Sequence, residues 1–161
     1  MTRKTTSLLA AAAVAVSGTA MADNTTDAAQ KAHMTYLAAI NSNDTARLLD
    51  AVTDDIVLIA PNAPPLVGKD AVAPWVAGYF DAVETTWKKQ TLEFVVGDGW
   101  AFERYSYSVV DRPRDGAPAS TDTGNGINIY RLDPDGVWRV ARDAWATDRP
   151  MPLTYEGMGP F

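Results

Sequence analysis

The sequence predicts one domain of the α+β class, with helices first and a mainly antiparallel sheet after them. In the first half of the chain, apolar side chains recur chiefly at three- and four-residue steps, the spacing of one helix face. After Thr85 the pattern changes to strands separated by short turns rich in Gly, Asp and Pro. Helices followed by consecutive strands indicate a sheet that wraps over the helices.

The N-terminus has the three parts of a secretory signal peptide. Arg3 and Lys4 give a positive start, residues 7–18 form an apolar core, and Ala20-Met21-Ala22 fits the small-x-small cleavage pattern. The apolar run is too short for a stable membrane anchor. We therefore expect residues 1–22 to be removed and the protein to be periplasmic or secreted; the alternative is a buried N-terminal helix.

Removal of the signal peptide leaves 139 of the 161 residues. This length suits one domain, which we place at 23–150. The remaining residues, 151–161, contain two prolines and two glycines, and we expect a loosely ordered tail there.

The composition narrows the classes of partner and cofactor. The mature chain keeps 12 of the 14 basic side chains and all 20 acidic ones, a net charge of −8, which disfavours nucleic acid and anionic membranes as partners. The chain has no cysteine and one histidine, His33, which removes thiolate sites and argues against a histidine-built metal centre. We expect no metal and no other cofactor.

Two helices are expected at the start of the domain. The first begins at Thr26, and its apolar residues recur as far as Ile40. The polar cluster 41–44 ends this helix and caps a second, shorter one, which ends at 54–55. Three apolar residues form the buried stripe of the second helix: Leu48, Leu49 and Val52.

A strand and a third helix come next. Residues 56–60 are a short apolar run of strand type, and three prolines within 61–65 hold an extended loop. A helix opens at 68–70, and Pro74 fits it only within the first turn, where backbone N–H groups lack helical partners. Its long apolar face consists of Val72, Trp75, Val76, Tyr79, Phe80 and Val83.

Four strands in a meander are expected after the third helix: 91–96, 100–110, 120–132 and 137–147. The last strand carries apolar side chains at both parities, which predicts that both of its faces are covered. It also carries Arg142 and Asp143, and a buried carboxylate is costly unless it is paired or hydrogen-bonded. We therefore expect one face of this strand to line a pocket.

Five local motifs in this order resemble the nuclear-transport-factor-two-like superfamily, and most closely its SnoaL-like and ketosteroid-isomerase-like branch. The motifs lie at 36–44, 53–58, 67–72, 101–104 and 138–145. The resemblance implies a cystatin-like cone, in which three N-terminal helices pack in a curved, mainly antiparallel sheet. It also implies an apolar pocket on the concave face and a homodimer through the convex face.

The resemblance also implies which side chains face the pocket. On the last strand it points Ala141, Asp143 and Trp145 inward, and Val140, Arg142 and Ala144 outward. On the long strand at 100–110 the inward residues are Ala101, Glu103, Tyr105 and Tyr107, and the outward residues are Trp100, Phe102 and Arg104.

Ketosteroid isomerases use a carboxylate base together with a tyrosine and a neutral acid as hydrogen-bond donors. The resemblance places their tyrosine at Tyr36, their acid near Asn128 and their base at Ala60. Because alanine cannot move a proton, ordinary ketosteroid isomerisation is not expected. A different reaction could use Asp143 or Glu103 as base, with Tyr36 and Asn128 as oxyanion donors.

Each of these side chains also has a structural interpretation. Asp143 could pair with Arg139, two residues away, and Glu103 could bond a tyrosine or a buried water. We expect His33 to be satisfied or exposed to solvent rather than a ligand or base.

Aromatic residues at helical spacing are usually core, and in a cone the core is also the pocket lining. We expect the ligand pocket to be lined by Trp75, Tyr79, Tyr105, Trp145 and Ala60.

Three functions are compatible with these features. The first is an exported domain that binds a small, largely apolar molecule in its cone. The second is a cofactor-independent isomerase, cyclase or lyase. The third is a dimerising interaction module with a vestigial pocket, whose convex face presents Trp100, Phe102 and Arg104.

Overall fold

A computed structural model describes residues 17–150 of the chain, with side chains from residue 26 onward. Residues 1–16 and the tail 151–161 lie outside the described residues, and the first helix runs through the expected cleavage point after Ala22, so the signal peptide and the tail stay predictions. The helices are α1 Ser17–Asn41, α2 Thr45–Asp50 and α3 Lys69–Ala82. In the described part of the chain, none of them is long and apolar enough to span a membrane.

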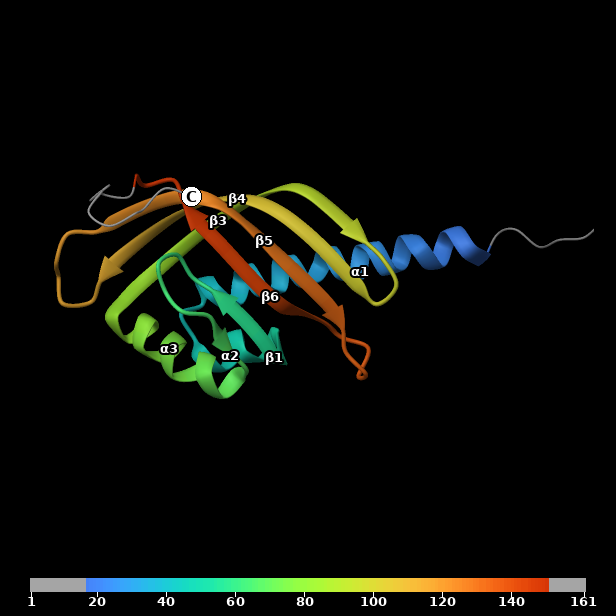
Figure 1. Cartoon of the computed structure of the whole chain (residues 1–161), viewed down its shortest axis with the longest axis horizontal. Helices are drawn as coiled ribbons and strands as arrows, with labels where there is room; N and C mark the ends of the chain where they lie inside the picture. Colours follow the sequence, from blue (N-terminus) through green and yellow to red (C-terminus); the bar gives the residue numbers. More distant parts are fainter. Residues whose placement is uncertain (1–16, 151–161) are drawn as a thin grey trace, which may run out of the picture.

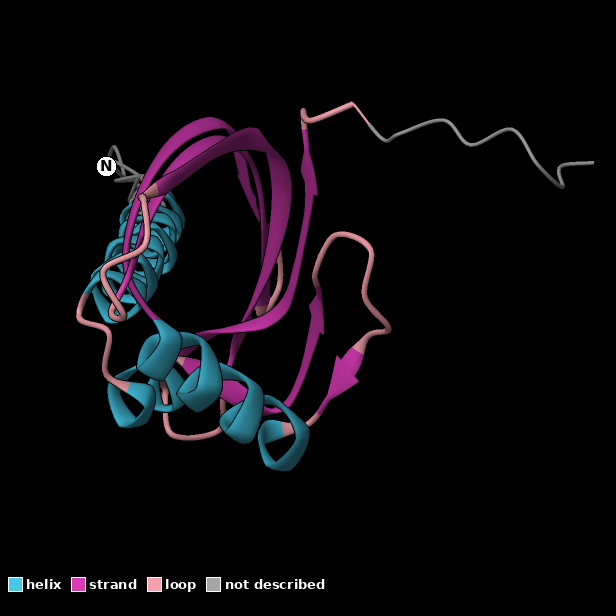
Figure 2. Ribbon diagram, turned by 90° about the vertical axis from the view of Figure 1, so that its left-hand side faces the viewer, coloured by secondary structure: helices cyan, strands magenta, loops and turns pink. Residues whose placement is uncertain are grey.

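The six strands form one sheet, in the order β2-β1-β6-β5-β4-β3. All neighbouring strands are antiparallel except β1 and β6. Seen end-on in Figure 2, the sheet curls into an arc, with α1 beside one end of it and α3 across its base. Figure 1 shows the same layers from the side, and together they confirm the predicted α+β cone. The strand bounds are β1 Val52–Ile59, β2 Leu66–Val67, β3 Val83–Val96, β4 Trp100–Pro113, β5 Ser120–Leu132 and β6 Trp138–Thr147.

The second helix is shorter than the sequence predicts. α2 ends at Asp50, and Val52 already belongs to β1, which also contains Asp54 and Asp55. Val52 is buried as expected, but as a strand residue that pairs with Val140 of β6. Pairing with a neighbouring strand has overridden the helical spacing of this segment.

The first strand of the meander, β3, begins at Val83, well before the predicted start at Thr91. Its early part contains Lys88 and Lys89, two adjacent charged residues that interrupt the apolar pattern expected of a strand. β3 nevertheless pairs with β4 along its whole length, apart from one bulge at Leu92. This extension places Lys89 within the sheet.

Pro74 is the sixth residue of α3, not a residue of its first turn as we expected. Because proline has no backbone N–H, the carbonyl of Asp70 receives no helical hydrogen bond from it. The helix continues because its next turns bury apolar side chains in the core. The buried residues of α3 are Val72, Val76 and Phe80.

A β-bulge in β6 explains why this strand is apolar at both parities. Tyr130 pairs with Val140 and Ile129 with Arg142, so Ala141 is an extra residue without a partner on β5. Val140 is completely buried in the core, which corrects its predicted outward direction. Arg142 points outward as predicted. The inward residues are therefore Trp138 and Val140 before the bulge, and Asp143 and Trp145 after it.

Candidate functional site

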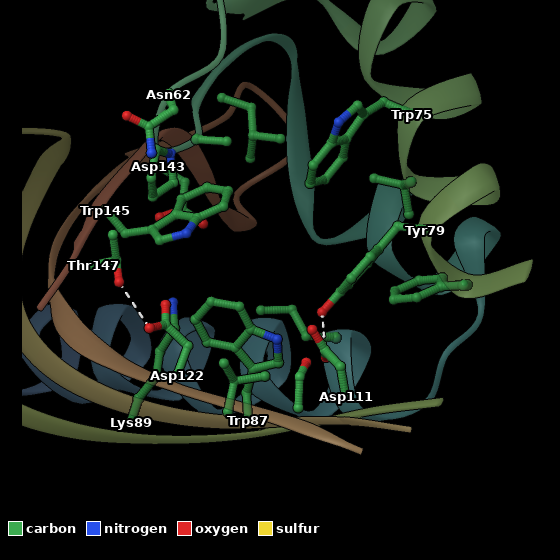
Figure 3. A pocket seen from close by; sticks show the side chains of 18 of the residues that line it. Asn62, Trp75, Tyr79, Trp87, Lys89, Asp111, Asp122, Asp143, Trp145 and Thr147 are labelled. Carbon is green, nitrogen blue, oxygen red and sulfur yellow. Dashed lines mark hydrogen bonds between the residues drawn. The ribbon is translucent and has the colours of Figure 1, made fainter. Parts of the chain in front are cut away.

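The concave face of the sheet, α3 and the loop after β1 enclose an open pocket with a volume of about 630 Å³ (Figure 3). Trp75 and Tyr79 stand one helical turn apart on α3, and their stacked rings have centroids 5.8 Å apart. Trp145 of β6 meets Trp87 of β3 edge to face, with centroids 6.1 Å apart. Aromatic side chains from a helix and two strands therefore form the walls.

Asp143 lies in the pocket wall with only 4% of its surface exposed. Its carboxylate accepts a hydrogen bond from the hydroxyl of Tyr36 at 2.7 Å and from that of Tyr105 at 3.0 Å. Burial, followed by the nearby Asp143 charge, raises the pKa of both tyrosines far above the ordinary value, so both remain neutral donors. Asp143 is thus held by two residues from different elements, α1 and β4.

Tyr105 reaches Asp143 because its partner on β5 is a glycine. Tyr105 pairs with Gly126, and a Cβ atom at Gly126 would overlap the ring and hydroxyl of Tyr105. The absence of a side chain lets the tyrosine ring lie flat across β5 toward β6. Gly126 therefore sets the position of one of the two donors to Asp143.

Lys89 is a pocket residue that the sequence analysis missed. Its Nζ donates to Asn128 Oδ1 at 3.0 Å and lies 3.9 Å from the ring centroid of Tyr105 and 5.0 Å from that of Tyr36. Burial lowers the pKa of Lys89, and the charges of Asp143 and Glu103 oppose this only in part. The strand signal that could have revealed it is the alternation of Thr85, Trp87 and Lys89 along β3.

Three polar residues form a row across neighbouring strands beneath the pocket. Glu103 of β4 pairs with Asn128 of β5, which in turn pairs with Asp143 of β6. All three are buried, and Asn128 Nδ2 has no hydrogen-bond partner within residues 26–150. The amide of Asn128 is therefore turned so that its oxygen binds Lys89.

Glu103 belongs to a separate network behind the pocket and does not line it. It accepts hydrogen bonds from His33 Nδ1 at 3.0 Å, Thr91 Oγ1 at 2.6 Å and the Tyr130 hydroxyl at 2.6 Å. Burial raises the pKa of Glu103, but these three hydrogen bonds outweigh it and leave the pKa below its ordinary value. Since its side chain has no exposed surface, Glu103 is out of reach of a pocket ligand.

Two further carboxylates, both unpredicted, line the outer part of the pocket. Asp111 accepts from the hydroxyl of Tyr79 at 2.7 Å, and Asp122 accepts from Thr147 at 2.7 Å; Figure 3 shows both contacts. Asp122 also accepts from the hydroxyl of Tyr107 and forms an ion pair with Arg149. The outer pocket thus mixes aromatic rings with hydrogen-bonded acids.

The structure brings most of the predicted site residues together. Tyr105 and Asn128 lie directly behind the pocket wall, where they contact Asp143 and Lys89 respectively. Arg139 pairs with Asp133 and Asp135, so the predicted pairing of Asp143 with Arg139 is wrong. The predicted residues that line the pocket are Tyr36, Ala60, Trp75, Tyr79, Asp143 and Trp145.

The site offers hydrogen bonding and acid–base groups rather than a metal cage. Within the described residues, no three histidine or carboxylate side chains are grouped so that they could hold a metal ion. What the inner part of the pocket does present, beside its aromatic walls, is the Asp143 carboxylate, the Lys89 amine and the Tyr36 hydroxyl.

Comparison with known proteins places this geometry in a family. The model of the SnoaL-like domain matches residues 34–142. A ketosteroid isomerase-like protein of Erwinia carotovora atroseptica is 25% identical, covers 78% of this chain and 97% of its own, and superposes with a TM-score of 0.71. No curated protein matches the chain significantly.

More distant structures share the fold. An NTF2-like protein of Salmonella enterica is 15% identical, with 85% of this chain and 99% of its own covered at a TM-score of 0.70. A candidate scytalone dehydratase of Novosphingobium aromaticivorans is 16% identical, with 83% and 89% covered at a TM-score of 0.70. The chain therefore belongs to the SnoaL-like domain family, and it shares its fold with a nuclear-transport-factor-two-like protein.

Proposed function

We propose that this domain binds a small, largely apolar molecule in its cone, with a polar end of the ligand directed at Asp143, Tyr36 and Lys89. The observation that carries the proposal is an open pocket whose aromatic walls end at these three polar side chains. Its volume of about 630 Å³ is typical of small-molecule sites. In a domain whose pocket is vestigial, side chains of the protein itself would be expected to fill the space, because protein interiors are close-packed. This pocket is open.

Binding can be tested by calorimetric titration of the domain with trans-cinnamyl alcohol, a small aromatic probe with one polar end. Trp145→Ala removes a pocket wall, so we expect the affinity for the probe to fall about tenfold or more. Trp100→Ala is the matched control, because Trp100 is exposed on the outer face of β4. Equal affinity of the Trp145 and Trp100 variants would count against binding in the cone.

A second candidate function is proton-transfer chemistry, as in a cofactor-independent isomerase, cyclase or lyase. It is favoured by one observation: the pocket holds a carboxylate, Asp143, together with an amine, Lys89, that could stabilise a developing enolate. In this reaction Asp143 acts as the general base, because alanine at position 60 cannot accept a proton. Glu103 is too deeply buried to act as the base.

The enzymatic candidate predicts faster deuterium exchange at the α-carbon of an enolisable ketone. With 2-tetralone in deuterated buffer, NMR should show exchange above the buffer rate, and Asp143→Asn should slow it about a hundred- to ten-thousand-fold. Exchange no faster than in buffer, or unchanged by the substitution, would leave binding alone as the function.

We also propose that the domain is exported. The order of charge, apolar core and cleavage site in residues 1–22 supports this. Sequencing the N-terminus of protein recovered from the periplasm or medium should give Asp23 as the first residue. An intact Met1 on the purified protein would contradict it.

We propose that the convex sheet face forms a homodimer. Apolar side chains are exposed on it, among them Val95, Trp100 and Ile127. Phe102→Glu, in the middle of this face, should convert a dimer to a monomer in light-scattering measurements. Glu93→Gln at the same face serves as the control, and an unchanged mass for Phe102→Glu would remove the case for this interface.

A further inference from the structure

We infer that Lys89 is an amine nucleophile that forms a reversible imine with the aldehyde or ketone end of the pocket ligand. This rests on the proposed binding function, since it concerns the same pocket. Among the lysines whose side chains the structure describes, Lys89 alone lines this pocket. Its neighbour Lys88 points to the opposite face of β3 and is exposed.

Burial makes the Lys89 amine easier to deprotonate than that of an exposed lysine, while the nearby Asp143 and Glu103 charges favour the ammonium form. Its hydrogen-bond acceptor is a neutral amide oxygen, on Asn128, and its other close neighbours are the ring faces of Tyr105 and Tyr36. Within residues 26–150 it forms no ion pair with a carboxylate. Burial lowers its pKa, and desolvated lysines of this kind serve as Schiff-base nucleophiles.

The reaction balances without any oxidant or further co-reactant. The neutral Nζ attacks the carbonyl carbon, a C–N bond forms, and the carbonyl oxygen gains a proton to give a carbinolamine. The C–O bond then breaks, and the oxygen leaves as water with both protons that the nitrogen has lost. Asp143, which lines the same pocket, can take a proton from the nitrogen and return it to the departing hydroxyl.

The pocket also indicates the class of carbonyl compound. Trp87 and Trp145 stand beside Lys89 and Asp143, so the group attached to the carbonyl meets aromatic rings. An aryl or unsaturated aldehyde or ketone places its flat apolar part between these rings and its carbonyl at the amine.

The alternative is that Lys89 acts only as a charged hydrogen-bond donor to the ligand. A donor needs no covalent bond, so the two roles separate in a trapping experiment. The full-length protein is incubated with trans-cinnamaldehyde, reduced with sodium cyanoborohydride, digested and mapped by mass spectrometry. Reduction converts an imine to a stable secondary amine on the lysine that formed it.

We expect the adduct on Lys89 to form about tenfold or more faster than on Lys88, because only Lys89 lies in the pocket that holds the probe. Lys89→Met should abolish the fast adduct, and Lys88→Met should leave it unchanged. Equal labelling of the two lysines in the wild-type protein would overturn the inference.

A competition on the wild-type protein keeps the test independent of whether the variants fold. trans-Cinnamyl alcohol fills the same pocket but cannot form an imine, so it should block labelling of Lys89 and not that of Lys88. If the alcohol binds and Lys89 is still not labelled preferentially, the imine is excluded while the binding function stands. If the alcohol does not bind and the aldehyde labels both lysines equally, both proposals fail.

Discussion

The hydroxyl of Tyr36 on α1 lies 2.7 Å from the carboxylate of Asp143 on β6, a hydrogen bond between residues 107 positions apart. It ties the first helix to the last strand at the pocket wall. Because the Asp143 side chain is almost completely buried, few water molecules can replace a lost donor. The contact therefore couples the integrity of the pocket to the stability of the fold.

Tyr36→Phe removes this donor while it keeps the ring. We expect the free energy of unfolding to fall by about 1.5–3 kcal/mol, the usual range for a hydrogen bond to a charged group. Urea denaturation measures it. Tyr107→Phe is the matched control, because Tyr107 donates a hydrogen bond to Asp122. In that variant Asp122 still accepts a hydrogen bond from Thr147, and its carboxylate is more exposed to water than that of Asp143. An equal loss in both variants would show that Asp143 does not depend on Tyr36.

Gly126→Ala should disturb the pocket from behind. The added Cβ would overlap the ring of Tyr105, so we expect a loss of about 1–3 kcal/mol and weaker binding of the probe alcohol. Gly78→Ala in α3 is the opposite case, because a Cβ there meets no atom within 4 Å. That substitution should stabilise the protein by up to about 1 kcal/mol through helix propensity. A Gly126 variant as stable as the Gly78 variant would contradict the close approach.

Acid should destabilise the protein partly through Glu103. Its pKa in the folded protein lies below the ordinary value of 4.5, so the unfolded chain binds the proton more tightly. The stabilisation is complete above the ordinary value and is lost as the pH falls through the lowered one. Urea denaturation at a series of acidic pH values should therefore show a steeper decline for the wild type than for Glu103→Gln. Parallel declines would assign the acid sensitivity to other groups.

Alkali should act through the buried tyrosines. Burial and nearby carboxylates raise the pKa of Tyr36, Tyr105 and Tyr130 well above 10.0, so the unfolded chain loses these protons first. Their stabilisation is complete below the ordinary tyrosine pKa and is lost as the pH rises beyond it. We expect the phenols of these three residues, followed individually by NMR, to ionise only together with the loss of near-ultraviolet circular dichroism. Ionisation of Tyr36, Tyr105 or Tyr130 in a protein that keeps its folded spectrum would contradict the burial of these hydroxyls.

Much of the sheet could be predicted because β4 alternates so regularly. Ala101, Glu103, Tyr105 and Tyr107 all point inward as expected: the period of two places them on one face, and the family resemblance indicated that this face is the inner one. The aromatic wall of α3 followed in the same way from helical spacing. Local periodicity therefore grouped the residues of each face, and the resemblance chose between the two faces of the sheet.

The parts that could not be predicted depend on pairing between distant segments. The bulge at Ala141 changes which residues of β6 face inward, from even-numbered before it to odd-numbered after it. Only the pairing of β6 with β5 reveals this bulge. Lys89 reads as one of two adjacent lysines in a polar stretch, and it becomes a pocket residue only because β3 is extended along β4. The hydrogen bonds that occupy Glu103 come from three elements, so no local pattern could exclude it as a base.

The pairing of acids with tyrosines has a consequence for what can enter the cone. Asp111, Asp122 and Asp143 all line the pocket, and each accepts a hydrogen bond from a phenol, which satisfies the oxygen but cancels no charge. The basic side chains among the lining residues are Lys89 and, beside Asp122, Arg149. Carboxylic acids and phosphate esters therefore meet repulsion on the way in, whereas neutral carbonyl compounds, alcohols and amines do not. The charge of a ligand therefore limits its entry into the cone before its shape does.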